Sequence, residues 1–170
     1  YIIFAEVFTV RCSIKVFIVL SIFLQENAKR QPHNKKKDVR QMKISLIVPC
    51  YNEQEALPIF YRETKKVMES MDCDYEMIFV NDGSKDETLD TLREVSRLYD
   101  NVHYFSFSRN FGKEAALLAG LEAADGDFVT VMDADLQDPP ELLVDMYQKI
   151  QEGYDVVGTR RSDRTGEPAI

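Results

Sequence analysis

Short apolar runs alternate with longer amphipathic segments from residue 42 onward. The short runs, rich in Val, Ile, Leu and Phe, are bounded by turn-forming residues and predict buried strands. The longer segments repeat apolar residues every three or four positions and predict helices with one buried face. The expected strands are 43–48, 75–80, 102–107, 128–132 and a fifth that starts at 155–157, and the expected helices are 55–71, 86–99, 113–124 and 140–151.

This alternation predicts an α/β fold with a Rossmann-like, mostly parallel sheet and helices on both faces. Ligands of such sheets bind beside the carboxyl ends of the strands. Polar clusters follow three of the expected strands, at residues 49–53, 81–84 and 133–135. We therefore expect these segments, although distant in sequence, to meet at one edge of the sheet and to form the ligand site.

Asp133 and Asp135 stand one residue apart at the end of an apolar run. In an extended backbone, side chains i and i+2 point to the same side, so both carboxylates are expected to face one point. Two close negative charges are costly unless a cation neutralises them, and a divalent metal with oxygen ligands fits that need. Gln137 offers a third oxygen. Such a metal is most useful where a diphosphate is held and released. The alternative is a strand-to-helix turn whose acidic residues only cap the backbone.

The first two clusters offer groups that suit a nucleoside. Asp82 precedes Gly83, which permits unusual backbone angles, and its carboxylate is a candidate acceptor for a ring N–H of a base. Pro49 stiffens the first loop, Tyr51 offers a flat ring, and Glu53 offers an acceptor for ribose hydroxyls. Each of these residues alone is also typical of an ordinary turn or surface loop, so that alternative stays open.

Cationic residues follow two further strands. Residues 109–113, Arg-Asn-Phe-Gly-Lys, bring two cations to the start of an expected helix, whose N-terminus suits a phosphate. The segment is not a Walker-type phosphate loop, and a solvated loop with a structural Gly112 is the alternative. Arg160 is expected where the fifth strand ends, either as a surface charge or as a contact to phosphate.

Composition narrows the class of protein. The chain has 170 residues, 45% of them hydrophobic, which fits a domain with a core and argues against disorder. Residues 1–41 carry eight Lys and Arg against three Asp and Glu (+5), which leaves thirteen against twenty-six (−13) for residues 42–170 and −8 in total. The acidic body argues against a nucleic-acid partner. Three cysteines without ligand spacing indicate reduced thiols in a cytosolic body, and Cys50 is expected to be buried.

Residues 1–41 differ from the rest of the chain. Their uninterrupted apolar run, 16–24, is shorter than the about 20 residues that cross a bilayer, and a basic stretch follows it. Three interpretations are a weak membrane anchor, a signal-like segment, and translated upstream sequence before a true start at Met42. We favour the last because composition changes abruptly there, and we expect an extension over 1–41 and a domain over 42–170.

The motifs together resemble a known family. The sequence contains, in this order, PCYNE, VNDGS, SRNFGKEAALLAG, DADLQDPPE and VVGTR. From residue 42 to about 168, this set resembles the family 2 glycosyltransferases of the GT-A fold. It is most similar to their polyprenyl-phosphate branch, the bactoprenol glycosyltransferases and dolichyl-phosphate mannose synthases.

The resemblance implies an inverting enzyme of cell-envelope glycan biosynthesis. Such an enzyme moves a sugar from a UDP- or GDP-sugar to undecaprenyl or dolichyl phosphate at the cytoplasmic face of the cell membrane, with Mg²⁺ or Mn²⁺. The implied nucleotide-sugar contacts are Pro49, Tyr51, Glu53, Val80, Asp82, Asp133, Ala134, Asp135 and Arg160, and the implied metal ligands are Asp133, Asp135 and Gln137. The lipid phosphate is already an anionic nucleophile, so no catalytic base is assigned.

The resemblance also implies segments beyond Ile170, including the rest of the acceptor half, an interfacial segment and often two membrane helices. We therefore expect the N-terminal portion of a GT-A domain, incomplete at the C-terminus, whose sheet edge after Val157 favours self-association into a homo-oligomer. Open alternatives are a family 2 enzyme with a polysaccharide or protein acceptor, and a nucleotide-sugar-binding fragment without turnover. A phospho-accepting receiver domain is disfavoured because Pro49 and Cys50, not an acidic pair, end the first strand.

Overall fold

The computed structural model of the chain describes residues 8–9 and 42–160. The chain divides into two compact units, Gln41–Asp145 and a second that joins Tyr1–Arg40 to Met146–Ile170. In the second unit, the short strand β1 (Phe8–Thr9) pairs in parallel with β6 (Thr159–Arg160). The predicted extension over residues 1–41, whether a weak anchor, a signal-like segment or translated upstream sequence, lies outside the described residues except for 8–9.

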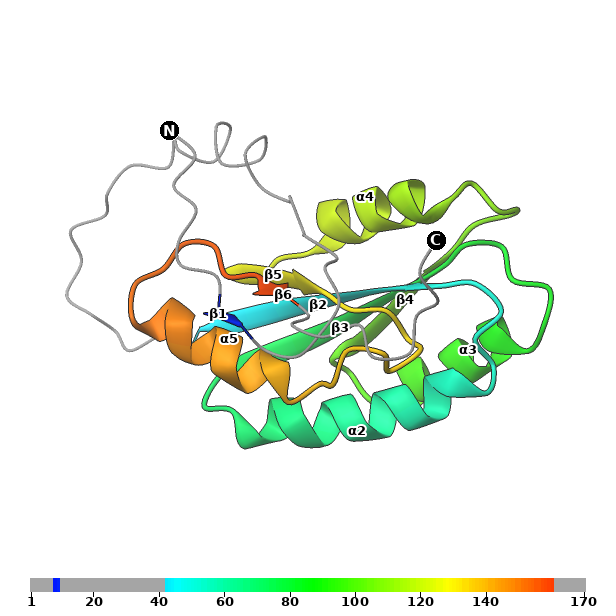
Figure 1. The fold of residues 1–170 in the computed structure, drawn as a ribbon. Helices are drawn as coiled ribbons and strands as arrows, with labels where there is room; N and C mark the ends of the chain where they lie inside the picture. The colour runs from blue at the N-terminus through cyan, green and yellow to red at the C-terminus, as the bar shows by residue number, and fades with distance from the viewer. Residues whose placement is uncertain (1–7, 10–41, 161–170) are drawn as a thin grey trace, which may run out of the picture. The chain divides into compact units, whose positions relative to one another are not determined.

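A parallel sheet of four strands, in the order β4-β3-β2-β5, forms the centre of the first unit (Figure 1). Its strands are β2 (Lys43–Cys50), β3 (Asp74–Asn81), β4 (Val102–Ser106) and β5 (Phe128–Val131). Long apolar runs form β2 and β3 because both strands lie in the middle of the sheet and are buried on both faces. The predicted parallel α/β fold is confirmed.

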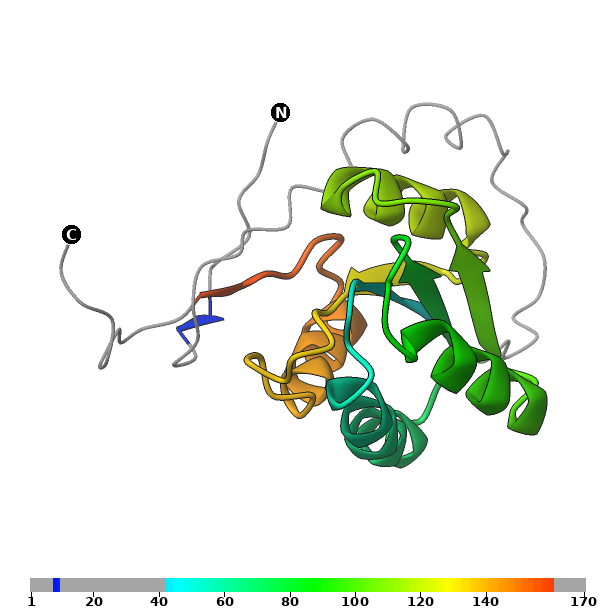
Figure 2. The same cartoon turned by 90° about the vertical axis from the view of Figure 1, so that its right-hand side faces the viewer.

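Helices cover both faces of this sheet, as the alternating pattern predicts. Within the first unit these helices are α2 (Ala56–Ser70), α3 (Thr88–Leu98) and α4 (Lys113–Ala123), whereas α5 (Leu142–Gln151) begins in this unit and continues into the second. In two views at right angles, α4 lies over one face, and α2 and α3 lie over the other (Figures 1 and 2). The observed bounds lie close to the predicted ones because apolar periodicity decides where each helix is buried.

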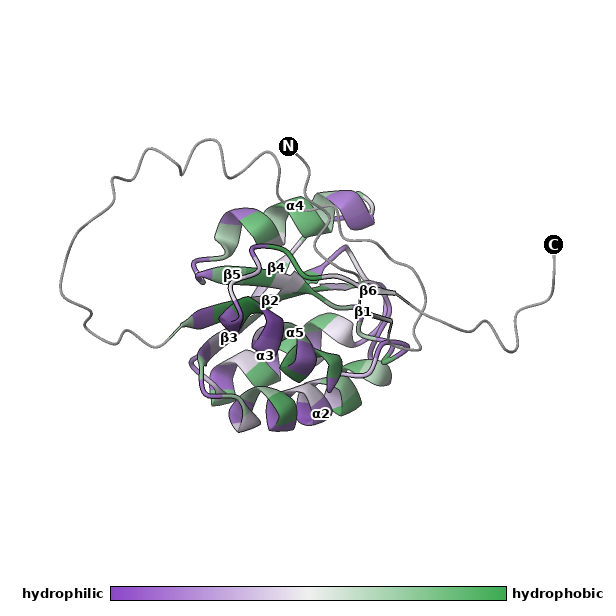
Figure 3. Cartoon of the chain, turned by 60° about the vertical axis from the view of Figure 1, so that its left-hand side comes forward, coloured by the Kyte–Doolittle hydropathy of each residue, from purple (hydrophilic) through white to green (hydrophobic). Residues whose placement is uncertain are grey.

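The two faces are packed differently. On one face the helix α2 is amphipathic (Figure 3), and Phe60 from its buried side meets Phe79 of β3 edge to face, with ring centroids 6.3 Å apart. On the other face α4 is apolar nearly all round and presents small residues to the sheet. Ala116 and Gly120 are its buried positions. A Cβ on Gly120 would lie well inside van der Waals contact of the side chain of Ile47, so the glycine sets how closely α4 approaches β2.

A buried acidic residue links the amino ends of the strands. Glu76, at 4% exposure, accepts hydrogen bonds from the hydroxyl of Ser45, from Lys43 Nζ at 2.9 Å and from the backbone N–H of Asp125 at 3.2 Å. Burial of a carboxylate is tolerated when its oxygens are bonded in this way. The role of Glu76 was not predictable from sequence, because its partners lie in other segments of the chain.

The predicted strand at 155–157 is wrong. Residues 155–158 form no strand in the structure, and β6 comprises only Thr159–Arg160. Val156 and Val157 are apolar residues typical of a strand. A strand forms, however, only where a neighbouring strand accepts and donates hydrogen bonds to its backbone. None of the helices in the described ranges combines the length and hydropathy that crossing a bilayer requires.

Gly120→Ala is expected to lower the free energy of unfolding by about 1–3 kcal/mol, because the added methyl group overpacks a rigid core. At an exposed helix position, Gly→Ala would instead raise the free energy of unfolding by up to about 1 kcal/mol. The sign of the change therefore shows whether Gly120 is tightly packed. Urea unfolding provides the measurement. Gly158→Ala, where a Cβ meets nothing within 4 Å, is the control.

The cost of Gly120→Ala should shrink in an Ile47→Ala background, which removes the clashing atoms. A Gly120→Ala variant as stable as the parent chain, or more stable, would contradict this account of the α4 packing.

Candidate functional site

The carboxyl ends of β2, β3 and β5 lie at the same edge of the sheet. Pro49 pairs with Val80, and Ile47 pairs with Val131. Two further hydrogen bonds continue this register, from the N–H of Asp82 to the carbonyl of Cys50 at 2.8 Å, and from the N–H of Met132 to the carbonyl of Ile47 at 3.0 Å. The segments 49–53, 81–84 and 133–135 therefore begin side by side, as predicted.

The loops after β2 and β3 are joined by hydrogen bonds. The N–H of Asn52 donates to the hydroxyl of Ser84 at 2.9 Å, and the amide oxygen of Asn52 accepts from the N–H of Lys85 at 2.8 Å. The N–H of Glu53 donates to the hydroxyl of Thr88 at 2.8 Å. Asn52 has φ 57°, a conformation that Asn adopts more readily than most residues. Short polar side chains in these two loops are thus required to hold them together.

Glu53 is partly buried and lies in the field of other carboxylates. The pKa of Glu53 is raised above its ordinary value, first by burial and then by the negative charges of Asp135, Asp133 and Asp86. The thiol of Cys50 is also buried, and its pKa is raised by burial, then by Glu53 and Asp133. Cys50 therefore stays protonated and packs as a small apolar residue, as predicted. Four acidic side chains from three loops share one electrostatic environment.

Asp133 and Asp135 do not meet through strand alternation. β5 ends at Val131, and a turn begins at Ala134, so the extended backbone expected across the two residues is wrong. Asp135 folds back on the chain, since its carboxylate accepts the N–H of Gln137 at 3.1 Å across Leu136, which has φ 57°. Asp133 is largely buried, whereas Asp135 is exposed.

Lys113 forms an ion pair with Asp133. The ammonium group contacts Oδ1 of the carboxylate, and the two side chains are 41% and 18% exposed. Lys113 is the first residue of α4, so its position depends on where that helix begins. From the sequence, Lys113 was expected either near a phosphate or in a solvated loop, and this ion pair was not predictable because 20 residues separate the partners.

Asp82 fixes the start of α4. Its two carboxylate oxygens accept the N–H groups of Phe111 at 2.7 Å and Gly112 at 2.9 Å. The backbone of Arg109 packs against Gly83 so closely that any Cβ there would overlap it, and Gly83 has φ 66°. A protein carboxylate, not an external phosphate, thus satisfies the amides that lead into the helix.

The remaining predicted residues differ in accessibility. Tyr51 is 41% exposed, and Pro49 is half-buried beside it. Val80 is fully buried and belongs to a core cluster with Ala116 of α4, and its contact with a base stays a prediction. Ala134 is also buried. Arg160 lies in β6, in the other compact unit.

The acidic cluster is not a closed metal cage. In residues 8–9 and 42–160, no three His, Cys, Asp or Glu side chains are grouped as metal ligands. Mg²⁺ usually keeps several waters and is held by one or two carboxylates together with substrate phosphates. The exposed carboxylate of Asp135 and the neighbouring Asp133 match this donor set.

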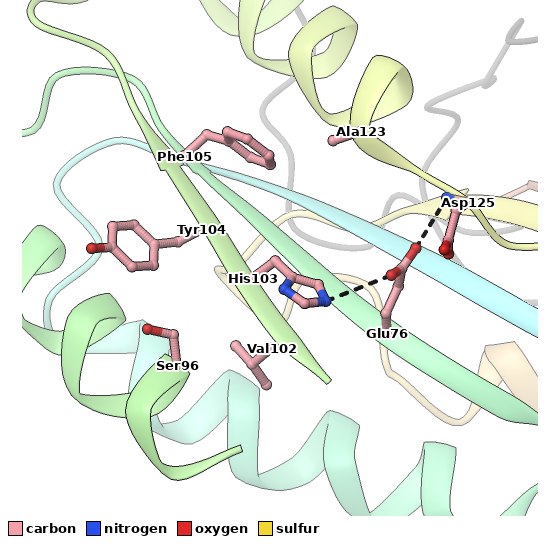
Figure 4. Close-up of a pocket in the computed structure, with 8 residues that line it drawn as sticks. All are labelled: Glu76, Ser96, Val102, His103, Tyr104, Phe105, Ala123 and Asp125. Carbon is pink, nitrogen blue, oxygen red and sulfur yellow. Dashed lines mark hydrogen bonds and ion pairs between the residues drawn. The ribbon is translucent and has the colours of Figure 1, made fainter. Parts of the chain in front are cut away.

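A shallow hollow of about 560 Å³ lies elsewhere, along the edge strand β4 (Figure 4). His103 lies beside Glu76 there, with 3.7 Å between His103 Nε2 and Glu76 Oε2. The polar atoms of Glu76 are already bonded by Ser45 and Lys43. The hollow therefore borders a structural network at the amino ends of the strands, opposite the edge where the three acidic loops begin.

Solved structures share this architecture. A crystal structure of S. aureus TarS superposes with a TM-score of 0.52 and 30% identity over 65% of this chain and 33% of that chain. TarS in complex with UDP gives a TM-score of 0.51 at 28% identity. Mannosyl-3-phosphoglycerate synthase from Rubrobacter xylanophilus, with a TM-score of 0.55 and 20% identity, supports the fold alone.

Curated relatives match more strongly in sequence. YkcC of Bacillus subtilis, an uncharacterized glycosyltransferase, is 46% identical over 128 residues, 75% of this chain and 40% of its own length. A bactoprenol glucosyl transferase of Shigella phage SfV is 47% identical over 73% of this chain and 40% of its own length. An undecaprenyl-phosphate 4-deoxy-4-formamido-L-arabinose transferase of Proteus mirabilis is 44% identical over 72% of this chain and 38% of its own length. The chain thus spans about 40% of the length of the first two relatives.

The family model for glycosyl transferase family 2 matches residues 45–169, which include every loop of the acidic edge. The parallel sheet, the similarity to GT-A structures and the identity to named transferases agree with that match. The chain belongs to glycosyl transferase family 2.

Proposed function

We propose that this chain supplies the donor-binding part of an inverting enzyme that moves a sugar from a nucleotide sugar to a polyprenyl phosphate. The observation that carries the proposal is the meeting of three acidic loops at the carboxyl edge of the sheet, where Lys113 forms an ion pair with Asp133. Close carboxylates favour a cation, and a cation in turn favours a diphosphate. The bactoprenol and undecaprenyl-phosphate transferases among the relatives support the lipid acceptor.

The nucleoside part of the donor would bind between the loops after β2 and β3. Tyr51 offers an exposed ring for stacking, and Pro49 keeps its loop stiff. Glu53 would accept a ribose hydroxyl. Each oxygen of Asp82 already accepts one backbone N–H, and a carboxylate oxygen can accept a second donor such as the ring N–H of a base.

The diphosphate would lie beside residues 133–137. Asp133, Asp135 and Gln137 would hold Mg²⁺ or Mn²⁺, and Ala134 would contact the diphosphate beside them. When bound, the metal would offset the negative charge that develops on the departing nucleotide diphosphate. The carboxylates themselves would position the donor. Their negative charge would also repel any anion that arrives without a bound metal ion.

The acceptor would be undecaprenyl or dolichyl phosphate at the cytoplasmic face of the membrane. A lipid phosphate attacks the anomeric carbon as an anion, so the described residues need not supply a strong general base. Arg160 would meet a phosphate of the donor or acceptor.

Asp135→Asn should remove the metal-dependent part of donor binding. We expect UDP-glucose or GDP-mannose, whichever the parent chain prefers, to bind about tenfold or more weakly in Mg²⁺, a loss of about 1.4 kcal/mol. Binding in EDTA should not change. Isothermal titration calorimetry with and without Mg²⁺ provides the measurement.

Asp90→Asn is the matched control, because Asp90 forms a surface ion pair with Arg93 on α3. Equal Mg²⁺-dependent binding by Asp135→Asn and by the parent chain would remove Asp135 from the site.

Glu53→Gln should stabilise the chain at neutral pH. Because the folded-state pKa of Glu53 is raised, the folded state holds the proton more tightly, and stability falls as pH rises through that pKa. Gln mimics the protonated form, so the variant should gain on the order of 0.5 kcal/mol at pH 7.5, since solvent screens a half-buried group. The gain should vanish near pH 4.

Urea unfolding at the two pH values, with Glu94→Gln on the exposed side of α3 as control, measures this difference. A Glu53→Gln variant that is less stable than the parent chain at pH 7.5 would show that the carboxylates do not repel one another.

A further inference from the structure

Lys113 is aimed at a carboxylate that the proposed function assigns to the metal. Its ammonium group contacts Oδ1 of Asp133, the more buried member of the acidic pair. In the same region Asp133 and Asp135 raise the pKa of Glu53. One positive charge therefore already neutralises part of a cluster that a divalent cation is expected to enter.

Two sets of contacts hold the loop that precedes Lys113. Asp82 accepts the N–H groups of the two residues that precede Lys113, and Gly83 packs directly on the backbone of Arg109. Since the loop cannot shift without breaking these contacts, α4 begins at one place and its first side chain reaches Asp133. The ion pair thus follows from the backbone arrangement.

An ammonium group and a divalent cation cannot occupy the same carboxylate oxygen. Lys113 carries one charge on a flexible stem, while Mg²⁺ or Mn²⁺ carries two charges and binds carboxylate oxygens at shorter distance. Either cation lowers the repulsion among the acidic residues, so each one weakens the binding of the other. The lysine is tethered and always present, whereas the metal arrives with the nucleotide.

We propose that Lys113 is a positioning residue that holds Asp133 as its counter-ion until a divalent cation and a nucleotide diphosphate displace it. This inference rests on the proposed function, because it requires the acidic edge to bind a metal-bound diphosphate. Lys113 thereby sets how much metal the site needs. The released ammonium group then faces the incoming anion.

Competition between Lys113 and the metal can be distinguished from a purely structural role of Lys113, because the two predict opposite changes in the metal concentration that nucleotide binding requires. Lys113→Met removes the competitor, so the Mn²⁺ concentration that gives half-maximal UDP or GDP binding should fall roughly three- to tenfold, the effect of a partly exposed ion pair. Damage to the site would raise that concentration. Lys113→Arg keeps the cation and should stay close to the parent chain.

The experiment is calorimetric titration of the 170-residue chain with UDP and with GDP at stepped Mn²⁺ concentrations. Lys66→Met is the matched control, because Lys66 forms a surface ion pair with Glu63 on α2. If the parent chain binds neither nucleotide in a metal-dependent way, the proposed function fails, and this inference with it. If the parent chain binds but Lys113→Met needs the same Mn²⁺ concentration or more, only the inference fails.

If Lys113→Met does not fold, a second measurement tests the proposal on the parent chain alone. The side-chain ammonium resonance of Lys113 in ¹⁵N NMR should shift when Mg²⁺ and the bound nucleotide are added together. The resonances of Lys66 and Lys149, which form ion pairs with neighbouring glutamates, should not shift. An unmoved Lys113 resonance at saturating Mg²⁺ and nucleotide would overturn the proposal.

Discussion

The hydrogen bonds from the N–H groups of Phe111 and Gly112 to the carboxylate of Asp82 are the contacts on which the site depends. They join the end of β3 to the start of α4, two elements that the chain order separates by a helix and a strand. Because a buried carboxylate with two charge-assisted bonds is costly to disrupt, the first turn of α4 is held at a fixed position. Lys113 reaches Asp133 from there, so Asp82 helps to place a positive charge beside Asp133.

That charge distribution connects the fold to the chemistry. A parallel sheet brings the ends of its strands together, and here three of those ends carry acidic loops. Such an edge repels anions unless cations accompany them, which is the condition that a metal-dependent donor site requires. The body of the chain, with net charge −13 over residues 42–170 (thirteen Lys and Arg against twenty-six Asp and Glu), strengthens the same requirement.

Sequence patterns predicted the parts of the structure that local burial decides. The apolar runs at β2 and β3 and the periodicity of α2 are strong because each element packs on the core, so element type and order followed directly. Contacts between distant segments were not predictable: Asp82 bonds a loop 29 and 30 residues away, and Asp133 meets a lysine 20 residues away.

Paramagnetic relaxation by Mn²⁺ in the presence of UDP tests the central claim most directly, because it locates the ion on the chain. The account predicts strong broadening of the amide resonances of residues 49–54, 82–86 and 133–137. The amides of Lys43, Glu76 and Asp125, at the opposite ends of the strands, should remain sharp. Broadening centred on those three residues, or equal broadening over the whole chain, would contradict a cation-dependent diphosphate site at the carboxyl edge.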